Sequence, residues 1–200
     1  MSANSFILAS GSTSRRSILE AAGVPFTGIS SELDEDSIKE TLLAEGADGA
    51  TIAHTLAEAK AFAVSQRQPD AIVLGADQIL VCGERIFSKA QDVAEARSTL
   101  EALRGRDHEL VSATVLARNG VLLWVRTDVA RLTMRVFSDA FLEEYIAAEM
   151  PDILNSVGCY RIEGRGALLF SSVKGEHFSI RGLPLIPVLE ALREFGALPP

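Results

Sequence analysis

The chain opens with a short apolar run, a turn of small hydroxyl residues and a pair of arginines within residues 6–19. The run over residues 6–9 predicts a buried strand, and Ile18, Leu19 and Ala22 recur close to helical spacing after the turn. Gly23 ends the predicted helix. This order of strand, turn and helix favours an α/β fold.

The turn between the strand and the helix suits a bound anion. The first N–H groups of a helix are unpaired and carry the positive end of its dipole. Ser10, Ser12 and Ser14 add hydroxyl donors, while Arg15 and Arg16 add charged, forked donors that match phosphate oxygens. The alternative is an ordinary hydroxyl cap followed by two solvated arginines, and the turn alone does not separate the two.

Composition narrows the class of ligand. With 200 residues and 48% hydrophobic content, the chain is long and apolar enough for a substantial core. The net charge of -8 argues against binding nucleic acid or an anionic membrane. The four lysines, at positions 39, 60, 89 and 174, form no basic run, so a small phosphorylated ligand held by a few cations fits better.

Location and redox state follow from what the sequence lacks. No window approaches the ~20 apolar residues of a membrane span, and the start does not resemble a signal peptide, so we expect a cytoplasmic protein. Cys82 and Cys159 have no metal-type spacing, which favours two reduced, partly buried thiols.

A second central stretch covers residues 71–81, a continuous apolar run that predicts a strand inside the sheet. Asp77 stands within it, after Gly75 and Ala76. A carboxylate there is costly to bury unless it is hydrogen-bonded, bound to a metal or open to a cleft. Because ligand sites in α/β sheets lie beyond strand ends, we predict a functional Asp77.

Other charged residues have two interpretations each. The acidic loop over residues 30–36 could hold a divalent metal, or Asp36 and Ser37 could simply cap the next helix. Lys60 lies in a predicted helix over residues 48–65, and Lys89 precedes one over residues 92–104. Both lysines could be plain surface residues.

The second half predicts a hairpin and two more helices. Residues 109–118 and 121–135 read as strands joined by Asn119 and Gly120, a strong hairpin signal. A helix is predicted from Ser138 to residue 149, and another closes the chain at residue 195. Between them, glycines punctuate strand-like residues 156–170, which favours tight bends over close approach to a ligand.

Taken together, these motifs resemble the Maf family of nucleoside triphosphate pyrophosphatases over nearly the whole chain. The matching segments are residues 8–12 with Arg15, Arg16, Ile18 and Leu19; residues 33–35; residues 56–61 with Lys60; residues 75–77; Lys89; residues 104–108; and residues 182–185. Their common order and spacing carry the resemblance.

The departures from the usual family pattern are informative. Gln78 replaces a threonine and Glu163 a glutamine, and Thr13 replaces a proline, so that the arginines fall one position later. These features are similar to the branch that acts on 7-methyl-GTP, and a glutamate can accept hydrogen bonds from guanine N–H groups. Asn155 and Ser156 replace the usual Asp-Lys, and Ser88 and Ala90 replace the residues around Lys89.

The resemblance implies one domain over residues 1–200, an α/β fold with a mixed, twisted sheet, flanking helices and two lobes around a nucleotide-binding cleft. It implies hydrolysis of a nucleoside triphosphate between its α and β phosphates, with Mg²⁺ or Mn²⁺ held by Glu35 and Asp77, and with Asp77 as the catalytic acid. Ser10, Ser12, Ser14, Arg15, Arg16, Lys60 and Lys89 would bind the phosphates, and Gln78 and Glu163 the base. A nucleotide-binding regulator of septum formation is the alternative, and the family's tendency favours a homodimer.

Overall fold

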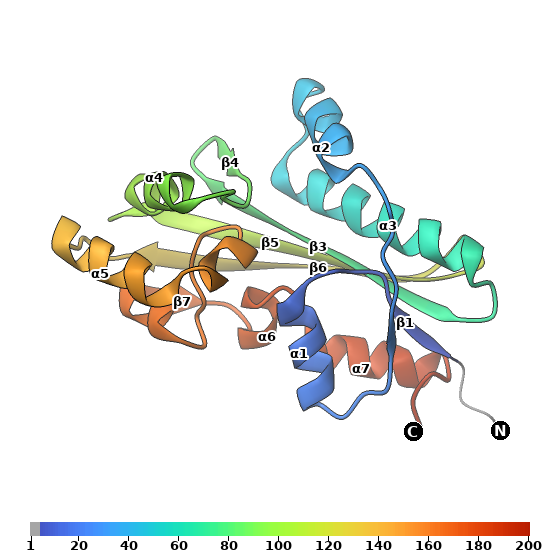
Figure 1. The fold of residues 1–200 in the computed structure, drawn as a ribbon. Coiled ribbons are helices and arrows are strands. Elements are labelled where there is room, and N and C mark those ends of the chain that lie inside the picture. The colour runs from blue at the N-terminus through green and yellow to red at the C-terminus, as the bar shows by residue number, and fades with distance from the viewer. Residues whose placement is uncertain (1–4) are drawn as a thin grey trace.

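Helices flank both faces of one mixed sheet in the computed structural model, which describes residues 5–200 (Figure 1). Residues 1–4 of the predicted domain lie outside the described residues. In the described chain the sheet has seven strands in the order β2-β1-β3-β5-β6-β7, with β4 also paired to β3. The predicted α/β class with a mixed sheet is therefore confirmed.

The strands are β1 (Phe6–Leu8), β2 (Thr27–Gly28), β3 (Ile72–Cys82), β4 (Arg85–Phe87), β5 (Asp107–Arg118), β6 (Val121–Met134) and β7 (Phe170–Lys174). The α-helices are α1 (Thr13–Ala21), α2 (Glu35–Ala44), α3 (Gly49–Arg67), α4 (Val93–Leu103), α5 (Asp139–Glu149), α6 (His177–Ile180) and α7 (Leu185–Glu194). Two 3₁₀ turns, η1 (Asp152–Asn155) and η2 (Arg165–Leu169), precede β7.

The central strand β3 has a gap along one edge. On that edge it pairs in parallel with β1 over residues 72–74 and antiparallel with β4 over residues 80–82. Residues 75–79 have no strand partner there, although β5 pairs with them on the other side. Asp77 lies in the middle of this gap, and Gln78 points to the opposite face because side chains alternate along a strand.

Helix α3 packs unusually close to β3, on the face that carries Asp77. A Cβ atom added at Gly75 would lie 2.2 Å from the Ala57 carbonyl oxygen and 2.6 Å from the Ala61 nitrogen. Only glycine allows this contact. The close packing brings Lys60, on the same face of α3, next to Asp77.

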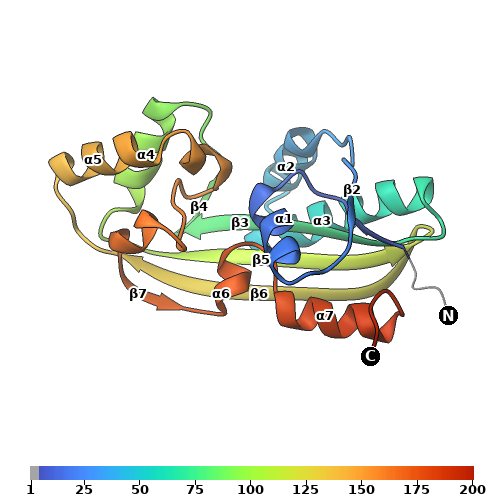
Figure 2. The ribbon, with the colours of Figure 1, turned by 60° about the horizontal axis from the view of Figure 1, so that its bottom comes forward.

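The core divides between the two ends of the sheet, as Figure 2 shows. One apolar cluster joins β4, α4, α5 and the start of β5, with Leu100, Leu142 and Tyr145 fully buried. Two others surround β1, with α1 and α7 on one face of the sheet and the end of α3 on the other. The last cluster packs the rest of α3 against β3 and β5. These are the two predicted lobes, and the gap in β3 lies between them.

Local predictions mostly agree with the structure. The hairpin turns at Asn119 and Gly120, whose φ angles of 50° and 70° suit the tight turn that this pair favours. One expectation was wrong: helix α2 is capped by Asp34, whose side chain accepts from the Ser37 N–H, and not by Asp36. Residues 156–169 form turns, in agreement with the tight bends expected there. At Gly166 a Cβ would lie 2.4 Å from the Arg161 carbonyl oxygen, so the chain bends back on itself.

Candidate functional site

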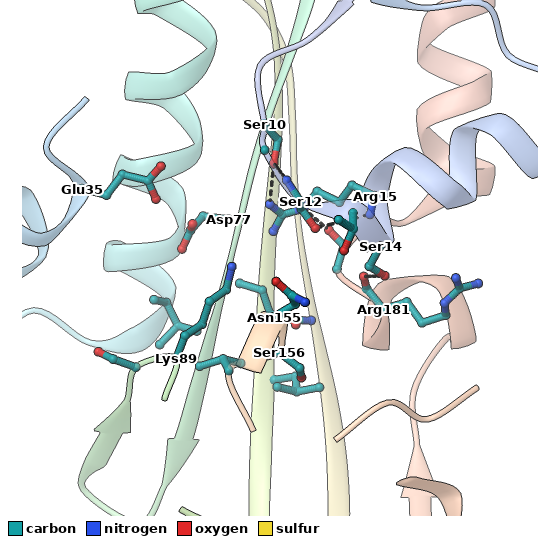
Figure 3. A pocket seen from close by; sticks show the side chains of 18 of the residues that line it. Ser10, Ser12, Ser14, Arg15, Glu35, Asp77, Lys89, Asn155, Ser156 and Arg181 are labelled. Atoms are coloured by element: carbon teal, nitrogen blue, oxygen red, sulfur yellow. Dashed lines mark hydrogen bonds between the residues drawn. The ribbon is translucent and has the colours of Figure 1, made fainter. Parts of the chain in front are cut away.

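A cavity of about 960 Å³ opens at the gap in β3, between the two lobes. Its walls come from the β1–α1 turn, the start of α2, the middle of α3 and β3, residues 87–91 after β4, residues 152–163, and residues 180–182 after α6. Figure 3 shows side chains from these segments converging on the cavity.

As for membrane spans, the part of the chain that the structure describes has no helix with the length and apolar content needed to cross a bilayer.

Lys60 joins two carboxylates at the bottom of the cavity. Its ammonium nitrogen lies 2.7 Å from Asp77 Oδ1 and 2.6 Å from Glu35 Oε2. Lys60 is only 4% exposed and Asp77 9%, whereas Glu35 reaches in from the exposed first turn of α2. A buried ammonium needs such partners, and the shared contact holds the two acids close together.

Arg15 forms the opposite wall, at the start of α1. Its Nε donates to the Gly182 carbonyl at 2.8 Å and its Nη1 to Ser10 Oγ at 3.1 Å. Burial lowers the pKa of Arg15, and the negative charges of Asp77 and Glu35 act in the opposite direction. Ser12 caps α1 by accepting from the Arg15 N–H, and Ser14 Oγ donates to the Arg181 carbonyl. The hydroxyl turn is therefore fixed in place around the cavity.

Lys89 reaches into the cavity without a hydrogen bond or ion pair to any described residue (Figure 3). Its pKa lies below the usual lysine value because of burial and, next in size, the nearby charges of Arg15 and Lys60. An ammonium held among other cations and left unpaired has its donors available for an anion.

Gln78 and Glu163 line the cavity on the side of α6. The Gln78 amide nitrogen donates to Ser112 Oγ at 2.8 Å and to the carbonyls of Ser179 and Ile180 at 3.0 and 3.1 Å. Three acceptors fix the orientation of this amide, so its carbonyl oxygen is the group left for a ligand. Glu163 pairs with Arg181 at 3.4 Å and also offers acceptors only.

Arg16 is the predicted binding residue that does not line the cavity. It is exposed on another side of α1, where its guanidinium lies 5.9 Å from the Phe26 ring centroid and against Gly28. The structure thus brings together the other residues predicted from the sequence and leaves Arg16 outside, because adjacent helical residues point about 100° apart.

The structure also adds residues that sequence reasoning missed. Lys39 of α2 donates to the Phe87 carbonyl and to Ser88 Oγ, at 3.2 and 2.7 Å, and its pKa is lowered mainly by burial. Arg161 and Arg181 line the cavity from the last third of the chain. Nothing in their local sequence distinguishes these residues from surface cations, and only the fold brings them to the site.

The whole cavity is balanced in charge. Its basic side chains are Arg15, Lys39, Lys60, Lys89, Arg161 and Arg181, and its acidic side chains are Asp34, Glu35, Asp36, Asp77, Asp152 and Glu163. Most of the acids lie at the α2 side or near residues 152–163, so a phosphorylated ligand would meet cations near α1 and Lys89. Asn155 and Ser156 lie on the wall facing the α1 turn (Figure 3).

Comparison with known proteins places this chain among relatives of similar length. It is 47% identical to the nucleoside triphosphate pyrophosphatase of Granulibacter bethesdensis over 192 residues, which cover 96% of this chain and 98% of the relative. It is 42% identical to the 7-methyl-GTP pyrophosphatase of Rhizobium meliloti, over 96% of each chain. The family profile described as Maf-like protein matches residues 5–195. This chain therefore belongs to the Maf family.

Proposed function

We propose that this protein hydrolyses a nucleoside triphosphate at the anhydride between its α and β phosphates, releasing a nucleoside monophosphate and pyrophosphate. The observation that carries the proposal is the arrangement of Asp77, Lys60 and Glu35 opposite the unpaired Lys89 and the buried Arg15. Relatives at 42–47% identity are named for this reaction, which supports an enzyme over a nucleotide-binding regulator.

Phosphate binding falls to the cations at the top of the cavity. Lys89 has no protein partner to give up, and Arg15 is already oriented by its bonds to Gly182 and Ser10. Prepositioned donors of this kind stabilise the charge that develops on departing pyrophosphate without a cost of reorganisation. The hydroxyls of the α1 turn and the first N–H groups of α1 add further donors.

The residues present fit a divalent cation. Glu35 and Asp77 place two carboxylate oxygens on one ammonium, so one small cation could bind both. Among the described residues no group of three or more His, Cys, Asp and Glu side chains could hold a metal, and Mg²⁺ characteristically takes one or two carboxylates together with substrate phosphates. A bound Mg²⁺ or Mn²⁺ would neutralise phosphate charge and polarise the phosphorus.

Asp77 is the group best placed to orient and deprotonate the attacking water. It is buried in the gap of β3, and Lys60 donates to its Oδ1, which fixes the carboxylate facing the cavity, where a positioned base can take a proton from water. The proton of the water passes to Asp77 as the new phosphorus–oxygen bond forms, and the pyrophosphate oxygen takes the electrons of the bond that breaks.

Acceptor groups near α6 favour a guanine-type base. The Gln78 amide nitrogen is committed to Ser112, Ser179 and Ile180, so Gln78 and Glu163 both offer oxygens to a ligand. Guanine presents the N1–H and amino donors that match two acceptors. Together with the relatives named 7-methyl-GTP pyrophosphatase, this supports 7-methyl-GTP as a substrate.

The test is pyrophosphate release from a panel of triphosphates, including 7-methyl-GTP, dTTP and UTP, with Mg²⁺ or Mn²⁺. We expect release to be fastest from 7-methyl-GTP and to fall by about 10²–10⁴-fold in Asp77→Asn, while that variant still binds the nucleotide. Asp70→Asn, on the exposed turn before β3, is the matched control and should keep full turnover. Turnover retained in Asp77→Asn would reject the role of Asp77, and release from none of the nucleotides would reject hydrolysis.

A further inference from the structure

Ser112 of β5 lies directly opposite Gln78 of β3 in the pairing of these two strands. It is only 1% exposed and is not one of the residues that line the cavity, so it does not touch a ligand itself. Its hydroxyl donates to the Ser179 carbonyl at 2.9 Å and accepts from the Gln78 amide nitrogen at 2.8 Å. Ser112 therefore connects a cavity residue to α6 from inside the sheet.

The bonds of this hydroxyl determine which end of the Gln78 amide it contacts. A carbonyl can only accept, so the single hydrogen of Ser112 Oγ goes to Ser179, and only lone pairs remain for Gln78. The Ser179 and Ile180 carbonyls also contact the amide and also offer acceptors alone. Gln78 must turn its NH₂ group toward all three, because its oxygen in that place would face three acceptors.

The oxygen of the amide is left for the cavity. A Cβ atom added at Gly182, which lines the cavity, would lie 3.8 Å from Gln78 Oε1. No described residue donates a hydrogen bond to this oxygen. The last torsion of a glutamine side chain is broad, so the direction of its oxygen depends on the partners of its nitrogen.

We propose that Ser112 is a positioning residue that determines base specificity through Gln78. Its hydroxyl holds the amide with Oε1 toward the cavity, where Oε1 accepts from an N–H donor of a guanine-type base. The same hydroxyl also holds the Ser179 carbonyl, so its loss removes one partner from Gln78 and loosens a second. This inference rests on the proposed function, and it adds a residue outside the cavity that sets the choice of substrate.

Thr114 offers a matched comparison on the same strand. It lies two residues along β5, so its side chain points to the same face as that of Ser112. It is fully buried, and its hydroxyl has no hydrogen-bond partner in the described chain. Thr114→Val thus removes a buried hydroxyl without breaking a hydrogen bond, whereas Ser112→Ala breaks two.

The test is the affinity for two triphosphates that cannot be hydrolysed, the 7-methyl-GTP and UTP analogues with a methylene group between the α and β phosphates. They share the phosphates, but guanine presents two neighbouring donors and uracil one donor between two acceptors. In Ser112→Ala, calorimetric titration should show the Kd of the 7-methyl-GTP analogue rising roughly threefold to tenfold. The Kd of the UTP analogue should change by less than about twofold.

Two further variants separate the hydroxyl from the space that it fills. Ser112→Thr keeps the hydroxyl and should keep the wild-type preference, as should Thr114→Val. Ser112→Cys is close to serine in volume but bonds weakly through sulfur, so it should lose the preference without leaving a cavity. This variant gives the same comparison if the alanine variant is unstable.

Equal losses of affinity for both analogues in Ser112→Ala and Ser112→Cys would overturn the inference, because Ser112 would then only support the fold. An unchanged preference in these variants would overturn it too. Both results leave the wild-type preference, and so the proposed base, in place. If the wild type itself did not prefer the 7-methyl-GTP analogue, the proposed base would be rejected together with the role of Ser112.

Discussion

Lys89 is available to bind an anionic ligand because its ammonium group is not paired with a side chain in the part of the chain that the structure describes. It has no hydrogen-bond or ion-pair partner among the described residues, and Arg15 and Lys60 lie near enough to lower its pKa together with burial. The positive charge of Lys89 is therefore electrostatically unfavourable in the free protein. A bound phosphate would make it favourable by supplying a negative partner. Affinity for a triphosphate should depend on this one proton.

The expected consequence is a pH dependence with a definite sign. Because the pKa of Lys89 is lowered, the ammonium is lost at a lower pH than in an ordinary lysine, and affinity falls as pH rises through that value. Loss of one charge-assisted contact corresponds to roughly 10–100-fold in Kd. Titration with a triphosphate analogue that is not hydrolysed, from pH 7 upward, measures it.

Lys89→Arg is the matched variant, since its guanidinium stays charged throughout. The affinity of Lys89→Arg for the triphosphate analogue should fall less over the same pH range. The pKa of Lys39 is also lowered, but Lys39 is present in both proteins, so its titration does not change the comparison. If triphosphate affinity depended on pH in the same way in wild type and in Lys89→Arg, Lys89 would not contact the phosphates.

Sequence reasoning at this scale identified a residue that lines the cavity where that residue sits in a constrained context. Asp77 stood out because an acid within a buried apolar run needs a reason to be there. Lys39, Arg161 and Arg181 did not, because a lysine or arginine in a polar segment looks the same whether it faces solvent or a cavity. Arg16 was predicted beside Arg15, but the helix turns it toward Phe26 and away from the cavity.

At the scale of elements, the contact between α3 and β3 determines the geometry of the site. Gly75 lets the α3 backbone lie directly on the strand, which brings Lys60 to Asp77. Gly75→Ala forces a methyl group against the Ala57 and Ala61 backbone, which cannot move without shifting the helix. We expect a loss of about 1–3 kcal/mol in the free energy of unfolding, together with reduced turnover.

Gly11→Ala is the control for stability, because a Cβ at Gly11 meets nothing within 4 Å and its φ is not positive. Chemical denaturation of both variants measures the difference. An unchanged unfolding free energy for Gly75→Ala would mean that α3 is free to shift, and that its close packing does not determine the position of Lys60.

Elements with a strong periodic pattern could be predicted, and those held by tertiary contacts could not. The strand over residues 71–81 and the hairpin at Asn119 and Gly120 agree with the structure because local sequence alone specifies them. The bends that the glycines of residues 156–170 indicated are present, but their course could not be predicted, because it depends on the close backbone contact of Gly166 with Arg161. The gap along the edge of β3 also could not be predicted from the local sequence of β3, because it depends on where β1 and β4 end.

At the scale of the whole molecule, the cavity takes its walls from both lobes. Arg15 and the hydroxyl turn belong to the lobe around β1, while Lys89 follows β4 in the other. The two lobes share β3 and β5 but have separate apolar cores. A triphosphate that contacts Arg15 and Lys89 together would therefore link the lobes and stabilise them as one unit.

Ligand binding should then stabilise the fold by mass action and protect both lobes at once. At a nucleotide concentration of 100 times Kd the gain is about 2.7 kcal/mol, which for a chain of this length raises Tm by roughly 5–11 °C. Asp77→Asn is the protein to use, since it should bind without turnover. Hydrogen exchange in the same samples should slow at residues 10–15 and at residues 88–90 together. If only one of these segments were protected, the nucleotide would bind to one lobe alone, and the lobes would not be linked through Arg15 and Lys89.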